Sequence, residues 1–334
     1  MKEAYLYKRI SGKKVRCDLC NHRCVIDDGE KGLCYVRENT GGVLFSLVYN
    51  KIIAENSDPI EKKPLFHFMP GTSSLSIATM GCNFRCFYCQ NYGISRTPSD
   101  FGIIEGKEVT PEEVVKHALA NGDSSISYTY TEPTVFFEYA YDTAKIARKK
   151  GLKNIFVTNG FMTRESLEMI RPYLDAANVD LKSFSNKTYM EKMGGRVKPV
   201  LDNIILMKKM DIWVEVTTLV IPTINDSDKE LRQIADFIAG VDKGIPWHIS
   251  AYYPSYKSDI PPTSAEQIKK AIEIGKKAGL EYVYGGNITG SSFENTYCPV
   301  CKSMLIERDR FYVISNKLKN GKCPKCGEEL KGIF

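Results

Sequence analysis

Cys82-Asn-Phe-Arg-Cys86-Phe-Tyr-Cys89, residues 82–89, is the most informative stretch of this 334-residue chain. It follows residues 75–80, Leu-Ser-Ile-Ala-Thr-Met, which are predicted to form a β-strand. Three thiolates on one short loop can bind three irons of a cubane cluster and leave the fourth iron free for another ligand. A partial zinc knuckle is the alternative, but zinc knuckles usually pair two C-x2-C units, whereas this triplet stands alone. The spacing therefore favours an iron–sulfur centre directly after a strand.

Outward from this loop the sequence alternates between strands and helices. The further predicted strands are 124–131, 154–158, 177–182, 212–220 and 247–253. The predicted helices are about 135–149, 163–174, 199–210, 228–239 and 264–278, with Gly151, Gly240 and Gly279 at expected helix ends. Thr110-Pro-Glu-Glu113 predicts one more helix start, with a capping box. The predicted class is α/β with a parallel sheet, either a partial (β/α) barrel or an open doubly wound sheet.

Polar residues follow successive predicted strands, where parallel α/β folds place their sites. Cys82 follows the first strand and Glu132 the second. Asn159 follows the third strand, and Asp180 and Lys182 end the fourth. His248 lies within the sixth strand. We therefore expect one edge of the sheet to collect most of the chemistry. Taken singly, these residues also fit a helix cap, a strand-end ion pair and a hydrogen-bonded core histidine.

The remaining eight of the eleven cysteines form two groups of four. Cys298-Pro-Val-Cys301 and Cys323-Pro-Lys-Cys326 are paired knuckles that predict a tetrahedral four-thiolate site, preferably for zinc, with mononuclear iron as the alternative. Cys17, Cys20, Cys24 and Cys34 have the spacing C-x2-C-x3-C-x9-C. For this group zinc and an auxiliary iron–sulfur cluster both stay open, and in either case His22 could replace one of its thiolates.

Composition sets limits on location and partners. The formal charge of +6 is mild and its charges are interleaved, which argues against nucleic acid as a main partner. No apolar run approaches the length of a membrane span, so no membrane partner is expected. The first residues lack the apolar core of a secretory signal, and an odd number of clustered cysteines does not suit a disulfide framework. We therefore expect a cytoplasmic protein.

The pattern C-x3-C-x-aromatic-C after a first strand, with Tyr88 before the last cysteine, resembles the radical S-adenosylmethionine (SAM) superfamily. That resemblance implies a [4Fe–4S] cluster on Cys82, Cys86 and Cys89 whose open iron binds SAM. It also implies reductive cleavage of SAM to a 5′-deoxyadenosyl radical that abstracts hydrogen from a substrate. The resemblance favours a partial (β/α)6 parallel barrel with small Cys-rich modules at both ends. It extends over about residues 75–255 to the branch of pyruvate formate-lyase activating enzymes.

Within that branch the chain resembles the AmmeMemoRadiSam-type enzymes. The residues that carry this resemblance are the N-terminal cysteine segment, Val216–Pro222 and Trp247–Pro254. It implies Memo-like and AMMECR-like proteins as partners. An electron donor such as ferredoxin or flavodoxin is also implied, and the activating-enzyme likeness implies a protein substrate.

The resemblance assigns SAM contacts motif by motif. Tyr130-Thr-Glu-Pro133 is similar to the family's Gly-Gly-Glu-Pro segment, although it lacks both glycines, so Glu132 is expected near the SAM amino group. Asp180-Leu-Lys182 resembles the motif whose lysine meets the SAM carboxylate. Thr158-Asn159-Gly160 resembles the family's Thr-Asn-Gly turn, and His248 resembles the histidine near the ribose. With Tyr88, these are the predicted cofactor-binding residues.

The sequence predicts that the chain divides into three segments, and it leaves two classes of function to compare. The segments are a Cys-rich module at 1–70, a radical SAM core at 71–290 and a rubredoxin- or zinc-ribbon-like knuckle at 291–334. The first class is an enzyme that abstracts hydrogen from an unidentified substrate, for which a protein, another macromolecule and a small molecule all stay open. The second is a non-catalytic, metal-stapled module that binds protein or nucleic acid. This second class leaves the three central cysteines unexplained.

Overall fold

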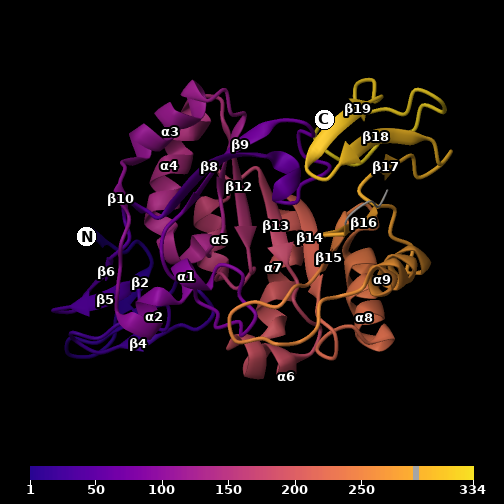
Figure 1. Cartoon of the computed structure of the whole chain (residues 1–334). Helices are drawn as coiled ribbons and strands as arrows, with labels where there is room; N and C mark the ends of the chain where they lie inside the picture. Colours follow the sequence, from indigo (N-terminus) through magenta and orange to yellow (C-terminus); the bar gives the residue numbers. More distant parts are fainter. Residues whose placement is uncertain (289–292) are drawn as a thin grey trace.

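The computed structural model describes residues 1–288 and 293–334 of the chain (Figure 1). The predicted boundary between the core and the C-terminal knuckle, at 290/291, lies outside the described residues. None of the described helices is long and apolar enough to cross a membrane.

The core is a sheet of eight strands, seven of them parallel and adjacent in chain order. The parallel strands are β9 (Ser73–Ala78), β11 (Ser125–Tyr128), β12 (Lys153–Thr158), β13 (Ala176–Asp180), β14 (Trp213–Val220), β15 (Trp247–Ala251) and β16 (Val283–Gly286). The eighth, β8 (Ala54–Pro59), pairs antiparallel with β9 at one edge. This sequential order is that of a partial parallel barrel, so the predicted fold class is confirmed. The six predicted strands are all present, and β16 extends the sheet.

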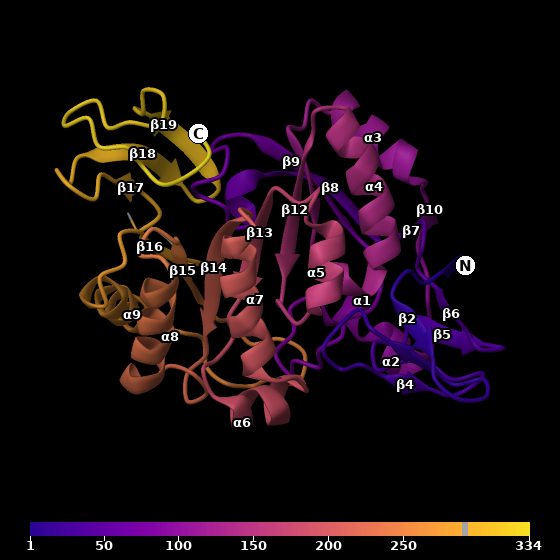
Figure 2. The same ribbon diagram turned by 180° about the vertical axis from the view of Figure 1, so that it is seen from behind.

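Helices connect the parallel strands and lie in front of them in Figure 2. The longer ones are α3 (Pro111–Ala120), α4 (Phe137–Lys149), α5 (Arg164–Ile170), α7 (Val197–Lys209), α8 (Asp228–Val241) and α9 (Ala265–Lys277). The shorter ones are α1 (Tyr92–Ser95), α2 (Thr97–Phe101), α6 (Asn186–Thr188), η1 (Ile60–Lys62), η2 (Pro133–Phe136) and the π-helical turn η3 (Tyr189–Met193). Thr110 and Glu113 form the predicted capping box at the start of α3. The apolar faces of these helices pack on the sheet in one extended core.

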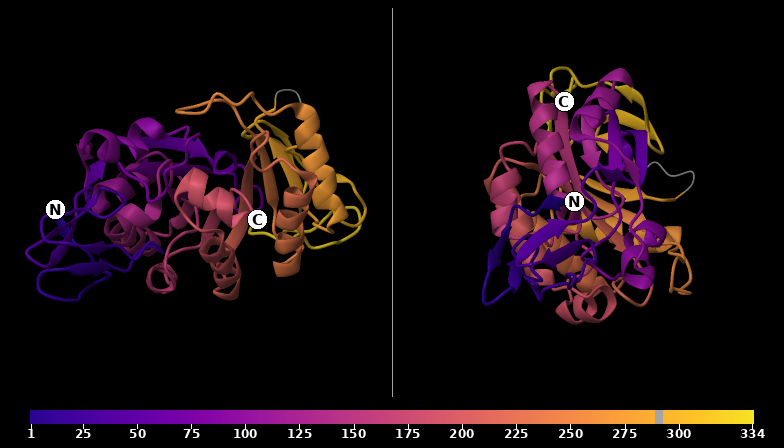
Figure 3. Two further views of the ribbon diagram at one scale, coloured as in Figure 1. Left: turned by 90° about the horizontal axis from the view of Figure 1, so that it is seen from below. Right: turned by 90° about the vertical axis from the view of Figure 1, so that its left-hand side faces the viewer.

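Small antiparallel sheets occupy both ends of the chain. The N-terminal ones combine β1 (Lys2–Glu3), β5 (Arg37–Thr40) and β6 (Val43–Ser46), then β2 (Tyr7–Arg9), β3 (Val15–Cys17) and β4 (Val25–Ile26), and lastly β7 (Lys51–Ile52) with β10 (Lys107–Glu108). The C-terminal sheet contains β17 (Thr296–Tyr297), β18 (Met304–Asp309) and β19 (Tyr312–Asn316). Figure 3 shows the indigo N-terminal sheets and the yellow C-terminal sheet at opposite ends of the molecule.

The two terminal modules contact the core sheet at opposite ends of its parallel strands. Cys20 forms an isolated bridge with Met162, just beyond the carboxyl end of β12. Arg308 in β18 instead donates to the backbone oxygen of Phe66, whose amide is bound by Glu215 near the start of β14. The N-terminal module therefore lies at the carboxyl ends of the parallel strands and the C-terminal module at their amino ends.

Two details differ from the sequence-based predictions. Gly240 does not end a helix but lies within α8, where nothing contacts the position its Cβ would take. The strand β8 belongs to the core sheet although it lies inside the predicted 1–70 module. Its pattern of exposed and half-buried polar residues carries no strong strand signal, because it is an edge strand.

Candidate active site at the carboxyl ends of the strands

The three central cysteines lie together beyond the end of β9. Gly81 precedes them with a φ of 99°, a left-handed conformation that turns the chain out of the strand. Cys82, Cys86 and Cys89 all line one cavity of about 560 Å³, a volume within the usual range of ligand sites. The thiol of Cys89 lies 3.2 Å from the hydroxyl of Ser95. The loop thus directs three soft ligands into a single space.

Glu132 lines the same cavity and organises the next strand end. Its Oε1 accepts from the amide of Thr134 at 3.1 Å and from the hydroxyl of Thr158 at 2.8 Å. Its Oε2 accepts from the amide of Asn159 at 2.8 Å. Burial raises the pKa of this carboxyl, and these hydrogen bonds oppose the shift. Glu132 therefore caps η2 and also fixes the turn after β12 against the cavity.

Asp180 and Lys182 form an ion pair at the end of β13, with Nζ and Oδ2 2.7 Å apart. Both line the cavity. Burial acts to lower the pKa of Lys182, but Asp180 outweighs it and raises the pKa well above its usual value. A permanent cation therefore faces the space beside the cysteines.

Asn159 and Tyr88 complete the predicted set at the cavity wall. Asn159 Nδ2 donates to the side-chain oxygen of Asn83 at 2.7 Å and lies 4.0 Å from the Cys82 sulfur. Tyr88 is buried, and its ring packs edge-on against Tyr252. The structure thus brings together eight of the nine predicted cluster and cofactor residues, namely Cys82, Cys86, Cys89, Tyr88, Glu132, Asn159, Asp180 and Lys182.

His248 is the exception, because it does not line this cavity. Its Nε2 lies 2.6 Å from Oε2 of buried Glu215, and its ring stacks on Tyr284 at 5.3 Å. Phe66 packs edge-on against the same ring. The expectation that His248 lies beside the SAM ribose is therefore not supported. Its imidazole belongs to a buried polar network inside the core.

Other cavity residues had no signal in the sequence. Lys63 and Asp58 come from β8 and the turn after it, and their side chains are 3.1 Å apart. Burial lowers the pKa of Lys63 to about 8, against the pull of Asp58. Tyr130 donates to Asp58 at 2.6 Å. Asp58 and Lys63 reach the cavity because β8 pairs with β9, a contact that no local motif predicts, whereas Tyr130 follows β11.

Thr217, in β14, offers an open hydrogen-bonding position in the cavity wall. Its buried Oγ1 has no hydrogen-bond partner among the described residues. A buried hydroxyl without a partner costs free energy unless a ligand or water satisfies it. The donor set and this open position fit a polar ligand bound beside a metal–sulfur group.

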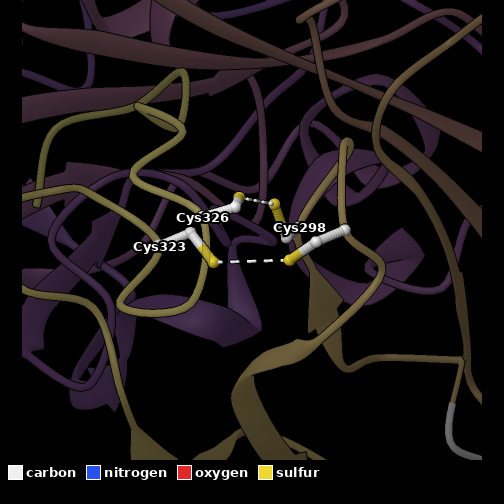
Figure 4. Close-up of side chains that lie close together, drawn as sticks. Cys298, Cys323 and Cys326 are labelled. Carbon is white, nitrogen blue, oxygen red and sulfur yellow. Dashed lines mark hydrogen bonds between the residues drawn. The ribbon is translucent and has the colours of Figure 1, made fainter.

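The C-terminal cysteines form a second, separate site (Figure 4). The four sulfur atoms lie within 4.8 Å of one another. Cys298 and Cys326 are 3.6 Å apart, as are Cys301 and Cys323. A tetrahedral ion with metal–sulfur bonds of about 2.3 Å would place its ligands about 3.8 Å apart. The described geometry therefore fits a single tetrahedral metal ion.

The N-terminal cysteines also converge. Cys17, Cys20, Cys24 and Cys34 all line one small cavity, together with His22 and Arg37. His22 Nε2 is engaged by the backbone oxygen of Asn83 at 2.8 Å, so this nitrogen acts as a donor to the chain.

A partial parallel barrel with three cysteines on the loop after its first parallel strand defines the class of radical SAM proteins. The Radical SAM superfamily matches residues 76–238, and the chain belongs to this superfamily. It is thereby an enzyme of this class, and the non-catalytic alternative is set aside.

The chain is similar to two curated proteins and one solved structure. Uncharacterized protein MJ0808 of Methanocaldococcus jannaschii is 43% identical over 334 residues and covers 99% of both chains. Pyruvate formate-lyase 1-activating enzyme of Escherichia coli K12 is 22% identical over 61% of this chain and 84% of its own. A radical SAM methyltransferase from Sphaerobacter thermophilus has a similar fold, with a TM-score of 0.50, 15% identity and 71% of each chain covered.

Proposed function

We propose that this enzyme cleaves SAM reductively at a [4Fe–4S] cluster held by Cys82, Cys86 and Cys89 and abstracts hydrogen from a substrate. The observation that carries the proposal is that these thiols share a cavity with Glu132 and the Asp180–Lys182 pair. The three cysteines leave one iron without a protein ligand from this loop.

A bound cluster and SAM supply the one-electron cleavage chemistry. The chain's own residues position these groups. The ammonium of Lys182 is placed to meet a carboxylate, because Asp180 keeps it charged. Glu132 holds the turn at Asn159 beside Cys82, and Thr217 Oγ1 is open to a ligand hydroxyl or carboxylate. The burial of Cys86 and Tyr88 keeps water from one side of the site.

We propose a protein as the substrate. The support is the family relationship to activating enzymes, together with an aromatic rim beside the cavity. Tyr92 is 46% exposed and stacks on Tyr256, with ring centroids 5.0 Å apart. Tyr256 is half-buried, so the exposed ring of Tyr92 is held in place by the stack and provides contact area for a peptide at low entropic cost. A substrate in a cell extract should stimulate SAM cleavage, and protease treatment of that extract should abolish the stimulation.

Further assignments complete the proposal. The C-terminal four-cysteine site binds zinc, which suits a closed structural site, and iron there would instead give a coloured rubredoxin-type centre. The N-terminal cysteines hold zinc or an iron–sulfur cluster. Ferredoxin or flavodoxin supplies electrons in the cytoplasm. Memo-like and AMMECR-like proteins are proposed partners, and co-purification with either one tests that assignment.

The central test is anaerobic reconstitution, reduction and addition of SAM, followed by measurement of 5′-deoxyadenosine. The wild type should produce it, and Cys86→Ala should not. Lys182→Met should raise the SAM concentration needed for half-maximal rate by at least about tenfold, because a charged contact is lost. Absence of 5′-deoxyadenosine together with no SAM-dependent change in the cluster's electron paramagnetic resonance would contradict the proposal.

A further inference from the structure

We propose that Cys17, Cys20, Cys24 and Cys34 hold a second [4Fe–4S] cluster, which relays electrons to the central site. The relay role rests on the proposed function. The cluster assignment rests on the geometry of the N-terminal module alone.

The four cysteines line one small cavity of about 20 Å³, together with Arg37, His22 and other residues. Four thiol side chains therefore border a common space, and four thiolates are the ligand set of a [4Fe–4S] cluster.

The spacing of the sulfur atoms differs between the cysteine groups of the chain. Among residues 1–288 and 293–334, the C-terminal cysteines are the group whose ligand atoms all lie within 4.8 Å of one another. Neither the N-terminal cysteines nor the central triplet meets that limit. The N-terminal group and the central triplet therefore both have sulfur atoms spread beyond that limit, unlike the C-terminal group. A cubane holds its thiolates further apart than one ion does, because four metal atoms lie between them.

The N-terminal cavity also borders a buried guanidinium group, that of Arg37. Arg37 is 2% exposed and lines the cavity. Its two terminal nitrogens bind Glu138, at 3.1 Å to Oε1 and 2.5 Å to Oε2. Its Nε has no hydrogen-bond partner among the described residues. A four-thiolate cluster is anionic and accepts hydrogen bonds at sulfur, which would satisfy this donor.

The relay follows from how the module contacts the central loop. His22, which lines the N-terminal cavity, donates through Nε2 to the backbone oxygen of Asn83, next to Cys82. Asn83 lines the same cavity. A Cβ on Gly81 would lie 3.3 Å from the backbone oxygen of Cys34. The ligand loops of the two sites are therefore in direct contact, with one hydrogen bond between them.

A low-potential one-electron donor protein of the ferredoxin or flavodoxin class reduces the N-terminal cluster by one electron. The N-terminal cluster is then reoxidised as it gives that electron to the central cluster. No proton or group is transferred in either step.

The cluster is tested in the full chain with Cys82, Cys86 and Cys89 all changed to alanine. After anaerobic reconstitution this variant should retain about four irons and four sulfides per chain. After chemical reduction, its cluster should give an electron paramagnetic resonance signal that does not change when SAM is added. A variant that holds two zinc ions and no iron overturns the assignment. This result does not depend on SAM cleavage, so it is separate from a failure of the proposed function.

The relay is tested with His22→Phe, and with His22→Gln as the matched control that keeps a side-chain N–H donor. Production of 5′-deoxyadenosine by His22→Phe should fall at least about fivefold with reduced ferredoxin or flavodoxin. With titanium(III) citrate, a small reductant that reaches the central cluster directly, it should stay within about twofold of the wild type. Equal rates with both reductants, or equal losses with both, overturn the relay. Iron content measured on each variant shows that both clusters are present.

Discussion

Glu132 already has hydrogen-bond donors on both carboxylate oxygens, so its role in the fold can be separated from contact with SAM. In Glu132→Gln an amide N–H would face the amide of Asn159 or the hydroxyl of Thr158. We expect the free energy of unfolding to fall by about 1–3 kcal/mol, because a buried donor loses its acceptor. SAM cleavage should fall with it, since the turn at Asn159 borders Cys82.

Urea unfolding and 5′-deoxyadenosine assays check this expectation. The matched control is Glu273→Gln, an exposed carboxylate on α9, which should change stability by less than about 0.5 kcal/mol. If Glu132→Gln keeps full stability but loses SAM binding, the carboxylate acts as a ligand of SAM and not as a support for the turn.

His67 gives a pH prediction at the same scale. Its Nδ1–H donates to the Lys331 oxygen, its Nε2 contacts the Tyr284 hydroxyl, and burial lowers its pKa to about 4 although Glu215 opposes the shift. Because the native pKa lies below the ordinary value of about 6.5, the unfolded chain takes up the proton first as the pH falls. This contribution to stability is complete above about pH 6.5 and is lost as the pH falls towards 4.

Between pH 7 and 5.5 the wild type should lose about 1 kcal/mol more stability than His67→Asn, a variant whose amide can still donate to Lys331. Urea titrations across this range measure the difference between the two slopes. Parallel slopes would show that another group dominates the acid response.

At the residue scale, the sequence predicts what local spacing determines. The cysteine loop and Asp180-Leu-Lys182 are each contained in a few residues at a strand end, so their convergence follows from a parallel sheet. His248 does not line the cavity but contacts Glu215, and strand periodicity does not say which end or face of β15 its ring occupies. Asp58 and Lys63 were missed because they reach the cavity through pairing of β8 with β9.

At the scale of elements, Gly81 governs how the N-terminal module docks on the central loop. A Cβ there would lie 2.6 Å from Val36 Cγ1, and its φ of 99° disfavours any side chain. Gly71 has a similar φ of 82°, but its Cβ would meet Val313 at an ordinary 3.6 Å. We expect Gly81→Ala to destabilise the protein by about 1–3 kcal/mol more than Gly71→Ala.

The double variant Gly81→Ala/Val36→Ala separates the two effects. Removal of the Val36 methyl groups should recover part of the loss if the clash is responsible. Thermal unfolding of the reconstituted proteins measures these differences. No recovery in the double variant would assign the whole loss to backbone strain.

Elements were predicted well where two independent signals agreed. The start of α3 has both a capping box and a proline at the first helical position, and the structure begins the helix there. Gly240 had only its residue type, and α8 continues through it because nothing in the packing requires a left-handed residue at that position. The edge strand β8 has no apolar alternation, so only its partner β9 reveals it.

At the scale of the whole molecule, the two flanking cysteine sites lie at opposite ends of the parallel strands and should therefore affect activity differently. The C-terminal module is fixed to the amino-end side of the sheet, where Arg308 contacts the Phe66 oxygen at 2.8 Å and pairs with buried Glu61. The central cavity lies at the carboxyl ends, beside the N-terminal module. In the sequence the two groups of four cysteines look alike. Which end of the strands each group occupies cannot be predicted from it, because these positions depend on long-range contacts.

Removal of the C-terminal metal with Cys298→Ser/Cys301→Ser should therefore affect stability and leave chemistry largely intact. We expect loss of about one zinc per chain and a fall in the unfolding temperature of at least about 5 °C, because a structural zinc contributes folding free energy. Below that temperature, 5′-deoxyadenosine formation should stay within about twofold of the wild type. Val300→Ser, an exposed position between the two cysteines, is the matched control and should keep the metal. A loss of activity in proportion to the metal, in protein that is still folded, would instead give this distant site a part in electron supply.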